Sequence, residues 1–193
     1  MTTVLILASA SPRRTALLNQ IGFSHRQFPV DIDETPLPDE TPAAMVARLA
    51  AQKALTAQQR LDSAPENAVI LASDTLIAFN KQPLGKPADK ADCLATLRQL
   101  SDNTHEVLTA VSVIQGQRQH TITVTTEVQF APLTDQDIDQ YWTTGEPADK
   151  AGSYAIQGIG GQFVKSVKGS VSSVIGLPLY ETKCLLNEFG VTP

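Results

Sequence analysis

The sequence predicts an α/β fold in which a mixed, twisted sheet is flanked by helices. Two continuous apolar runs, residues 4–8 and 68–72, are typical of strands that are covered on both faces. Segments with helical spacing follow these strands, and two β-branched segments at 105–114 and 119–130 surround Gly116 as in an antiparallel hairpin. Strands that alternate with helices, joined to a hairpin, favour a mixed sheet.

The chain length is suited to one domain. A chain of 193 residues can bury about 70% of its unfolded surface, so it needs no disulfide or metal to hold it together. We find no internal repeat and no low-complexity linker, and we therefore expect a single domain over residues 1–193.

The first half of the chain carries clear helix start signals. Ser11 followed by Pro12 predicts an N-cap and the first helical residue, and Gly22 predicts the end of that helix. Thr41 and Pro42 repeat the start signal for a helix that runs to about residue 61. Between these helices, we predict a short strand over residues 28–30 and an acidic loop over residues 31–39.

The second half of the chain begins with the second buried strand, which we expect to extend from residue 68 to residue 79. A Pro/Gly turn region over 80–88 and a helix over 91–100 precede the hairpin. Thr134 and Asp135 then predict a capped helix that ends at Gly145. Residues 146–178 are expected to be rich in loops and strands, and a last helix is expected over 179–189.

The composition excludes several classes of protein. The formal net charge is −5, and the aromatic residues are one Trp, three Tyr and six Phe, so neither a basic surface nor a stacking platform for nucleic acid is expected. No apolar run exceeds five residues, which excludes a membrane-spanning helix. The segment Ala8-Ser9-Ala10 resembles a signal-peptidase site, but no positive charge precedes it, so we interpret it as following a buried strand.

The cysteines and histidines do not predict a metal or nucleophilic site. Cys93 and Cys184 fit no metal or redox spacing, and we expect both to be reduced, structural thiols of a cytoplasmic protein. The three histidines lack zinc spacing and an evident nucleophile partner. No nucleophile elbow is present.

The segment from Ala8 to Arg14 is a candidate phosphate site. It joins a buried strand to a helix start, where backbone N–H groups favour an anion, and two arginines add bidentate donors. A solvated helix face with Ser11 as its cap is the alternative. Arg13 and Arg14 oppose the helix dipole, which that alternative must explain.

Asp74 is a candidate base or metal ligand. It lies within the apolar stretch 68–79, where an anion is costly to bury unless it is paired or bound to a metal. A structural salt bridge or a turn is the alternative. Lys53 follows Met45 and Leu49 at helical spacing, so its ammonium group either serves a site or simply extends to solvent.

Two further segments offer ligand contacts. Gly85-Lys86-Pro87 presents one lysine on a rigid turn, but the surrounding residues do not form a Walker loop. Residues 154–161 form a Gly-rich segment in which Gln157 offers a donor and an acceptor, although an ordinary hairpin turn explains the glycines equally well. Cations together with carboxylates suit metal-assisted hydrolysis at phosphorus by water.

Taken together, these motifs resemble those of the Maf family of nucleoside triphosphate pyrophosphatases, and the resemblance runs from Leu5 to about Phe189. The motifs that carry it are Ala8-Ser-Ala-Ser-Pro-Arg-Arg14, Ala72-Ser-Asp-Thr75, Gly85-Lys-Pro87, Asp149-Lys-Ala-Gly-Ser-Tyr-Ala-Ile-Gln-Gly158 and Gly176-Leu-Pro178. The sequence has Ser73 where alanine is frequent in the family and Val171 where an aromatic residue is frequent. The resemblance implies an elongated fold of two lobes around a central cleft, related to that of inosine triphosphatase, and a homodimer.

The resemblance also implies roles for single residues. Asp74 is similar to the proton acceptor that activates water, and Glu34 and Asp74 are placed to hold a divalent cation, with Mg²⁺ expected first and Mn²⁺ or Co²⁺ as alternatives. The residues expected to bind phosphate are Ser9, Arg14, Lys53 and Lys86. The residues expected to set substrate specificity are Arg13, Thr75 and Gln157.

Thr75, Arg13 and Gln157 together resemble the family members that act on dTTP and UTP. The implied reaction is cleavage between the α and β phosphates, with release of a monophosphate and pyrophosphate. One alternative is a pyrophosphatase for 7-methylguanosine triphosphate or another modified nucleotide, a group that has Gln where Thr75 stands. The other alternative is a regulator of septum formation that binds a nucleotide without hydrolysing it.

Overall fold

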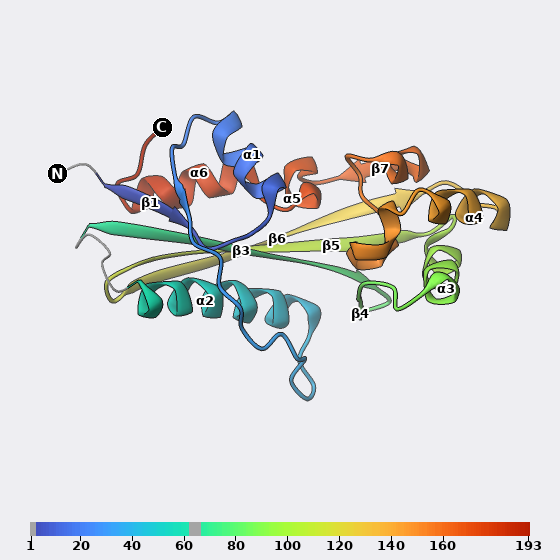
Figure 1. The fold of residues 1–193 in the computed structure, drawn as a ribbon, viewed down its shortest axis with the longest axis horizontal. Helices are drawn as coiled ribbons and strands as arrows, with labels where there is room; N and C mark the ends of the chain where they lie inside the picture. The colour runs from blue at the N-terminus through green and yellow to red at the C-terminus, as the bar shows by residue number, and fades with distance from the viewer. Residues whose placement is uncertain (1–2, 62–66) are drawn as a thin grey trace.

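The computed structural model describes residues 3–61 and 67–193, which fold around one long mixed sheet (Figure 1). The strands are β1 (Val4–Leu7), β2 (Arg26–Gln27), β3 (Ala68–Phe79), β4 (Gln82–Leu84), β5 (Thr104–Gln115), β6 (Arg118–Phe130) and β7 (Val164–Lys168). The helices are α1 (Pro12–Gln20), α2 (Pro42–Arg60), α3 (Lys90–Leu100), α4 (Asp135–Thr143), α5 (Val171–Ile175) and α6 (Leu179–Glu188). Three short 3₁₀ turns are η1 (Glu146–Asp149), η2 (Ala151–Ser153) and η3 (Ile159–Phe163).

The sheet confirms the predicted α/β class with a mixed sheet. The strand order is β2-β1-β3-β5-β6-β7, and β4 pairs with β3 outside this path. The strands β2, β1 and β3 run parallel, whereas β3, β5, β6 and β7 form antiparallel pairs. The predicted hairpin is the pair β5–β6.

Two strands, β1 and β4, pair with different parts of the same edge of β3 and leave a gap between them. β1 pairs with residues 68–71 of β3, and β4 pairs with residues 77–79 on the same side. Along this edge, no strand of the described residues pairs with residues 72–76. This gap, which we call the β3 notch, lies where β1 ends and α1 begins.

Helices cover both faces of the sheet (Figure 1). Odd-numbered residues of β3, such as Leu71, pack with Leu17 of α1 and Leu185 of α6. Even-numbered residues, such as Ile70, pack with Ala54 of α2. Since side chains alternate along a strand, consecutive residues of β3 face different helical layers.

The far end of the sheet is covered by α3 and α4. Leu97 of α3 and Ile138 of α4 belong to a cluster with the buried rings of Phe130 and Phe163. His105 is buried in the same region, and its Nε2 lies 2.8 Å from the hydroxyl oxygen of Tyr154. Burial lowers the pKa of His105 to about 4.

The predicted helix starts are confirmed. The side chains of Ser11, Thr41 and Thr134 accept hydrogen bonds from the backbone N–H groups of α1, α2 and α4. Each bond satisfies one of the N–H groups that a helix start leaves unpaired. None of the described helices is both long and apolar enough to cross a membrane.

Several expectations require correction. Phe28 and Val30 do not form the predicted strand, because β2 ends at Gln27 and β1 offers no partner beyond Leu7. The region 80–88 contains β4, joined to β3 by Asn80 and Lys81 with positive φ angles. Cys93 is buried as expected, whereas Cys184 is exposed.

The segment 146–178 also differs from the expectation. It holds one strand, β7, together with three 3₁₀ turns and the short helix α5. The Gly-rich segment, residues 154–161, leads into η3 and does not join two paired strands, so the alternative of an ordinary hairpin turn is wrong. The division into two lobes around a central cleft stays a prediction.

Candidate active site

Arg14 is the centre of the site on the face of the sheet that carries α1. Its Nε donates to the carbonyl oxygen of Gly176 at 2.8 Å, its Nη1 to Ser9 Oγ at 3.3 Å and its Nη2 to Thr75 Oγ1 at 3.2 Å. The guanidinium group therefore joins the end of β1, the middle of β3 and the turn between α5 and α6. Burial lowers the pKa of Arg14, while the negative charges of Asp74 and Glu34 act in the opposite direction.

The hydroxyl group of Thr75 is oriented by its neighbours. It accepts from Arg14 and lies 3.0 Å from the hydroxyl oxygen of Thr109, which donates to the carbonyl oxygen of Ser173 at 2.8 Å. Because the single hydroxyl proton of Thr109 goes to Ser173, Thr75 donates to Thr109. The hydroxyl groups thus form a directed chain from Arg14 to α5.

The carbonyl oxygen of Gly176 accepts a second hydrogen bond, from Ser73 Oγ at 3.1 Å. Gly176 has a φ of +132°, a backbone conformation that favours glycine. The Gly176-Leu-Pro178 motif therefore fixes the α5–α6 turn against β3. Ser73, which replaces the alanine frequent in the family, adds one contact to this junction.

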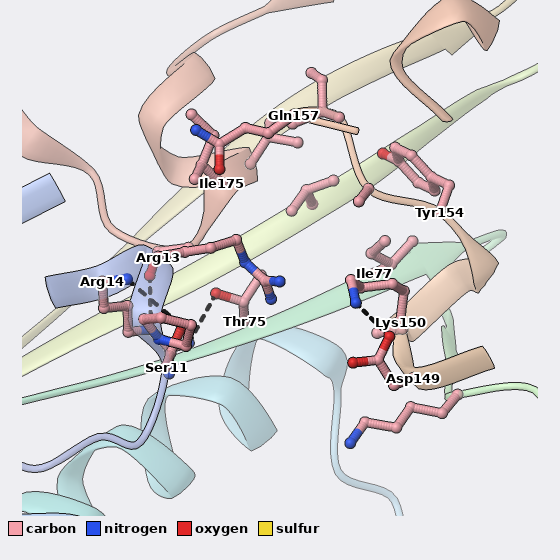
Figure 2. Close-up of a pocket in the computed structure, with 18 of the residues that line it drawn as sticks. Ser11, Arg13, Arg14, Thr75, Ile77, Asp149, Lys150, Tyr154, Gln157 and Ile175 are labelled. Atoms are coloured by element: carbon pink, nitrogen blue, oxygen red, sulfur yellow. Dashed lines mark hydrogen bonds and ion pairs between the residues drawn. The ribbon is translucent and has the colours of Figure 1, made fainter. Parts of the chain in front are cut away.

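A cavity of about 690 Å³ opens beside Arg14 (Figure 2). Its volume is within the range of small-molecule sites. Four cationic side chains and one carboxylate line it, together with apolar groups of β3, β5 and α5, and this balance favours an anionic ligand. These charged residues are Arg13, Arg14, Lys86, Lys150 and Asp149.

The opposite face of β3 carries a second cluster of charges. Lys53 Nζ lies 2.6 Å from Asp74 Oδ1 and 2.6 Å from Glu34 Oε1. The side chains of Lys53 and Asp74 are only 13% and 12% exposed, whereas that of Glu34 is 57% exposed. Lys53 therefore does not extend to solvent as the alternative reading supposed.

The predicted site residues fall into these two groups. Arg13, Arg14, Thr75, Lys86 and Gln157 line the cavity. Glu34, Lys53 and Asp74 form the cluster on the opposite face. Ser9 belongs with Arg14, to which it is hydrogen-bonded, but it does not line the cavity. Asp74 and Thr75 are consecutive, so their side chains point to opposite faces of β3, and the β3 notch is the place where the two faces meet.

Asp149, Lys150 and Tyr154 are among the cavity residues that were not predicted as site residues. Asp149 and Lys150 pair with each other at the rim of the cavity, and Tyr154 forms part of its wall (Figure 2). All three belong to a motif that carries the family resemblance, which was the available signal. Their side chains reach the cavity because Gly152 N donates to Gly85 O at 2.9 Å, which fixes this segment beside Lys86.

The carboxylates partly fit a divalent cation. Among the residues that the structure describes, no group of three or more His, Cys, Asp or Glu side chains is placed to hold a metal ion. Glu34 and Asp74 nevertheless converge on one ammonium group, and Mg²⁺ is commonly held by one or two carboxylates plus phosphate oxygens of a substrate. These two residues therefore fit a cation that a bound polyphosphate helps to hold.

Known proteins are similar in sequence to this chain over nearly its whole length. A dTTP/UTP pyrophosphatase of Pseudoalteromonas atlantica is 50% identical over 188 residues, which cover 97% of this chain and 98% of that protein. A dTTP/UTP pyrophosphatase of Vibrio vulnificus is 50% identical over 185 residues, with coverage of 96% and 98%. The structure of the Staphylococcus aureus Ham1 protein matches with a TM-score of 0.43 and 15% identity, over 67% of this chain and 72% of that one.

The model of the Maf-like protein family matches residues 4–189. This range holds the β3 notch, both charged clusters and every predicted site residue. With relatives at 50% identity over nearly the whole length, the chain belongs to the Maf family.

Proposed function

We propose that this protein hydrolyses dTTP and UTP to the nucleoside monophosphate and pyrophosphate. The observation that carries the proposal is the cation-lined cavity at the β3 notch, directly across β3 from the Lys53–Asp74 pair. The relatives named dTTP/UTP pyrophosphatase support this choice of substrate.

The lining of the cavity offers groups that suit both parts of a nucleotide. Arg14 and the start of α1 supply guanidinium and backbone N–H groups, which bind phosphate. Gln157 and Ile175, drawn above Arg13 in Figure 2, and Tyr154, drawn to their right, supply an amide and apolar groups, which suit a nucleobase. We infer that the triphosphate extends from the cavity through the β3 notch toward Lys53.

Asp74 is the proposed proton acceptor. A water molecule attacks the α phosphorus, its proton passes to the Asp74 carboxylate, and the bond from the α phosphorus to the bridging oxygen breaks as pyrophosphate leaves. Arg14, Lys53 and Lys86 neutralise charge on the phosphate oxygens, and such electrostatic stabilisation is the largest single contribution in many enzymes. General-base help contributes about 10²–10⁴-fold.

A divalent cation, Mg²⁺ first with Mn²⁺ or Co²⁺ as alternatives, belongs to the same proposal. Glu34 and Asp74 would hold it, and it would polarise the phosphoryl oxygens. Ser9 is proposed to position Arg14, because Ser9 Oγ accepts a hydrogen bond from Arg14 Nη1. A homodimer, expected from the resemblance, and a cytoplasmic location, expected from the cysteines, also remain proposals, and light scattering on the purified protein tests the first.

The test is release of pyrophosphate from a panel of nucleoside triphosphates with Mg²⁺, with the wild type beside Asp74→Asn. We expect release from dTTP and UTP, and a loss of at least 10²-fold in the variant. Near wild-type turnover by Asp74→Asn would refute the base assignment. Activity confined to 7-methylguanosine triphosphate would overturn the substrate, and binding without product would favour the regulator.

A further inference from the structure

The carboxylate of Glu146 accepts hydrogen bonds from the backbone of a separate turn, η3. Glu146 is the first residue of η1, directly after Gly145, which has a φ of +76°. Its Oε1 accepts from Tyr141 Oη at 2.6 Å and from Gly160 N at 2.9 Å, and its Oε2 accepts from Ile159 N at 2.9 Å. Two consecutive N–H groups of η3 therefore end on one side chain.

Tyr141 extends this arrangement to the other end of the turn. Its hydroxyl group donates to Glu146 and accepts from Ala155 N at 3.3 Å. Its ring is buried and meets the ring of Phe163 edge-on, with 5.0 Å between the centroids. Tyr141 and Glu146 thus hold the backbone at residue 155 and at residues 159–160, on both sides of Gln157.

Glycine is needed at three positions of this turn because other atoms of the protein approach them closely. A Cβ atom at Gly158 would lie 2.1 Å from Glu146 Oε2, and one at Gly160 would lie 2.5 Å from Tyr141 Oη. A Cβ at Gly161 would lie 2.5 Å from the carbonyl oxygen of Ile156. The Gly-rich sequence therefore wraps the chain around Glu146, a use that phosphate contact does not explain.

The protonation states agree with this geometry. Although burial acts in the opposite direction, hydrogen bonds from Tyr141, Gly160 and Ile159 lower the pKa of Glu146. Burial and the neighbouring carboxylate raise the pKa of Tyr141. A charged acceptor beside a neutral hydroxyl donor gives short, strong hydrogen bonds.

Gln157 is the residue whose place this arrangement determines. It is exposed, lines the cavity and lies beside Ile175 in Figure 2. An exposed amide has little packing of its own, so the position of its donor and acceptor depends on the backbone on either side. That backbone is fixed by Glu146 and Tyr141.

We propose that Glu146, together with Tyr141, is a positioning residue for nucleobase selection, because it sets the place of Gln157 in the cavity. The inference rests on the proposed function, in which the cavity takes a nucleoside triphosphate. Glu146 acts through Gln157 and touches no part of the substrate.

The experiment measures equilibrium binding of α,β-imido analogues of dUTP and dATP, which resist cleavage between the α and β phosphates. The proteins compared are the wild type, Glu146→Gln, Gln157→Ala and the double variant. Glu127→Gln is the matched control, since it also removes a carboxylate. Glu127 is exposed, lies outside the cavity and pairs with Lys168, with 3.2 Å between Oε2 and Nζ. Melting temperature is recorded for each protein.

We expect Glu146→Gln to reduce the preference for the dUTP analogue about 10-fold, which is the net worth of one hydrogen bond from Gln157, while Glu127→Gln keeps it. We expect no further loss when Glu146→Gln is added to Gln157→Ala, because both changes then act on the same contact. If Glu146→Gln does not fold, Tyr141→Phe removes only a hydroxyl group and carries the same expectation.

Two results would overturn the inference. One is a lower melting temperature with an unchanged dUTP preference, which would leave Glu146 a purely structural role. The other is a loss in the double variant that exceeds the loss in Gln157→Ala. If the wild type binds neither analogue, the proposed function fails first and the inference falls with it.

Discussion

Lys53 of α2 and Asp74 of β3 form a partly buried ion pair, with 2.6 Å between Nζ and Oδ1. The same ammonium group lies 2.6 Å from Glu34 in the loop that precedes α2. One cation thus stands between two carboxylates that come from separate segments. Removing it would leave the largely buried carboxylate of Asp74 without its cation and close to the like charge of Glu34, which is unfavourable.

Lys53→Met is therefore expected to reduce kcat/KM for dTTP by about 10²-fold or more, because a charge that stabilises the phosphoryl oxygens is lost. Steady-state pyrophosphate release provides the measurement. Lys90→Met is the control, since Lys90 forms an exposed pair with Asp139 away from the site. Equal losses in the two variants would contradict a role for Lys53 at the phosphates.

Metal binding offers a second test of the same pair. In the nucleotide-free protein, Lys53 already pairs with both carboxylates and offsets part of their charge, so we expect weak binding of Mn²⁺ to the wild type. Lys53→Met should bind Mn²⁺ more tightly, since both carboxylates then lack their cation. Electron paramagnetic resonance of free Mn²⁺ measures this without any turnover, and unchanged binding would argue against a metal site at Glu34 and Asp74.

The hydroxyl chain through Thr75 predicts a difference between two small substitutions. Thr75→Val removes the acceptor for Arg14 and the donor to Thr109, and we expect a loss of about 1–3 kcal/mol in the free energy of unfolding and a higher KM. Thr75→Ser keeps the hydroxyl group and is expected to lose much less. Urea denaturation and kinetics together compare the two variants.

His105 predicts a pH dependence of stability. Its pKa is lowered to about 4 in the folded protein, against about 6.5 in the unfolded chain, so the unfolded chain binds more protons between these values. Stability is therefore fully present above about pH 6.5 and falls by about 3 kcal/mol as the pH drops toward 4. His105→Gln should show a smaller decrease when urea denaturation is repeated at pH 7 and pH 5.

Gly152 tests the packing beside the cavity. It has a φ of +64°, and a Cβ atom there would lie 2.8 Å from Ile77 Cδ1, in the cavity wall. We expect Gly152→Ala to cost about 2–4 kcal/mol, from backbone strain and overpacking. Gly116→Ala is the matched control, because Gly116 has a φ of +58° with nothing within 4 Å. Each variant's loss in the free energy of unfolding is measured against the wild type. The difference between the two losses isolates the contact with Ile77.

Local signals predicted those parts of the fold that depend on neighbouring residues. The caps of α1 and α2 were predicted because a side chain satisfies N–H groups only two or three residues away. The prediction of a strand over residues 28–30 was wrong because strand pairing depends on where β1 ends. The prediction that Cys184 is a structural core thiol was wrong because Leu185 and Leu186 define the buried side of α6, and Cys184 lies outside it.

Sequence patterns named candidate residues for the site but not their arrangement. Strand alternation places the side chains of Asp74 and Thr75 on opposite faces of β3, yet only the helical layers show what lies on each side. The partners of Lys53 are distant in sequence, so helical spacing alone could not exclude a solvent-exposed lysine. Glu146 gave no signal, since an acidic residue before a proline in a loop is common, and its role depends on glycines that follow 12 to 15 positions later.

The alternation of side chains along β3 separates two of the proposed tasks. Thr75, proposed to set substrate specificity, faces the cavity, whereas its neighbour Asp74, the proposed proton acceptor, faces Lys53 on the other side. A substitution on the first side can alter which nucleotide is accepted while the hydrolytic group stays intact. Substrate preference can therefore be altered at Thr75 while the proton acceptor next to it in the chain keeps its own surroundings.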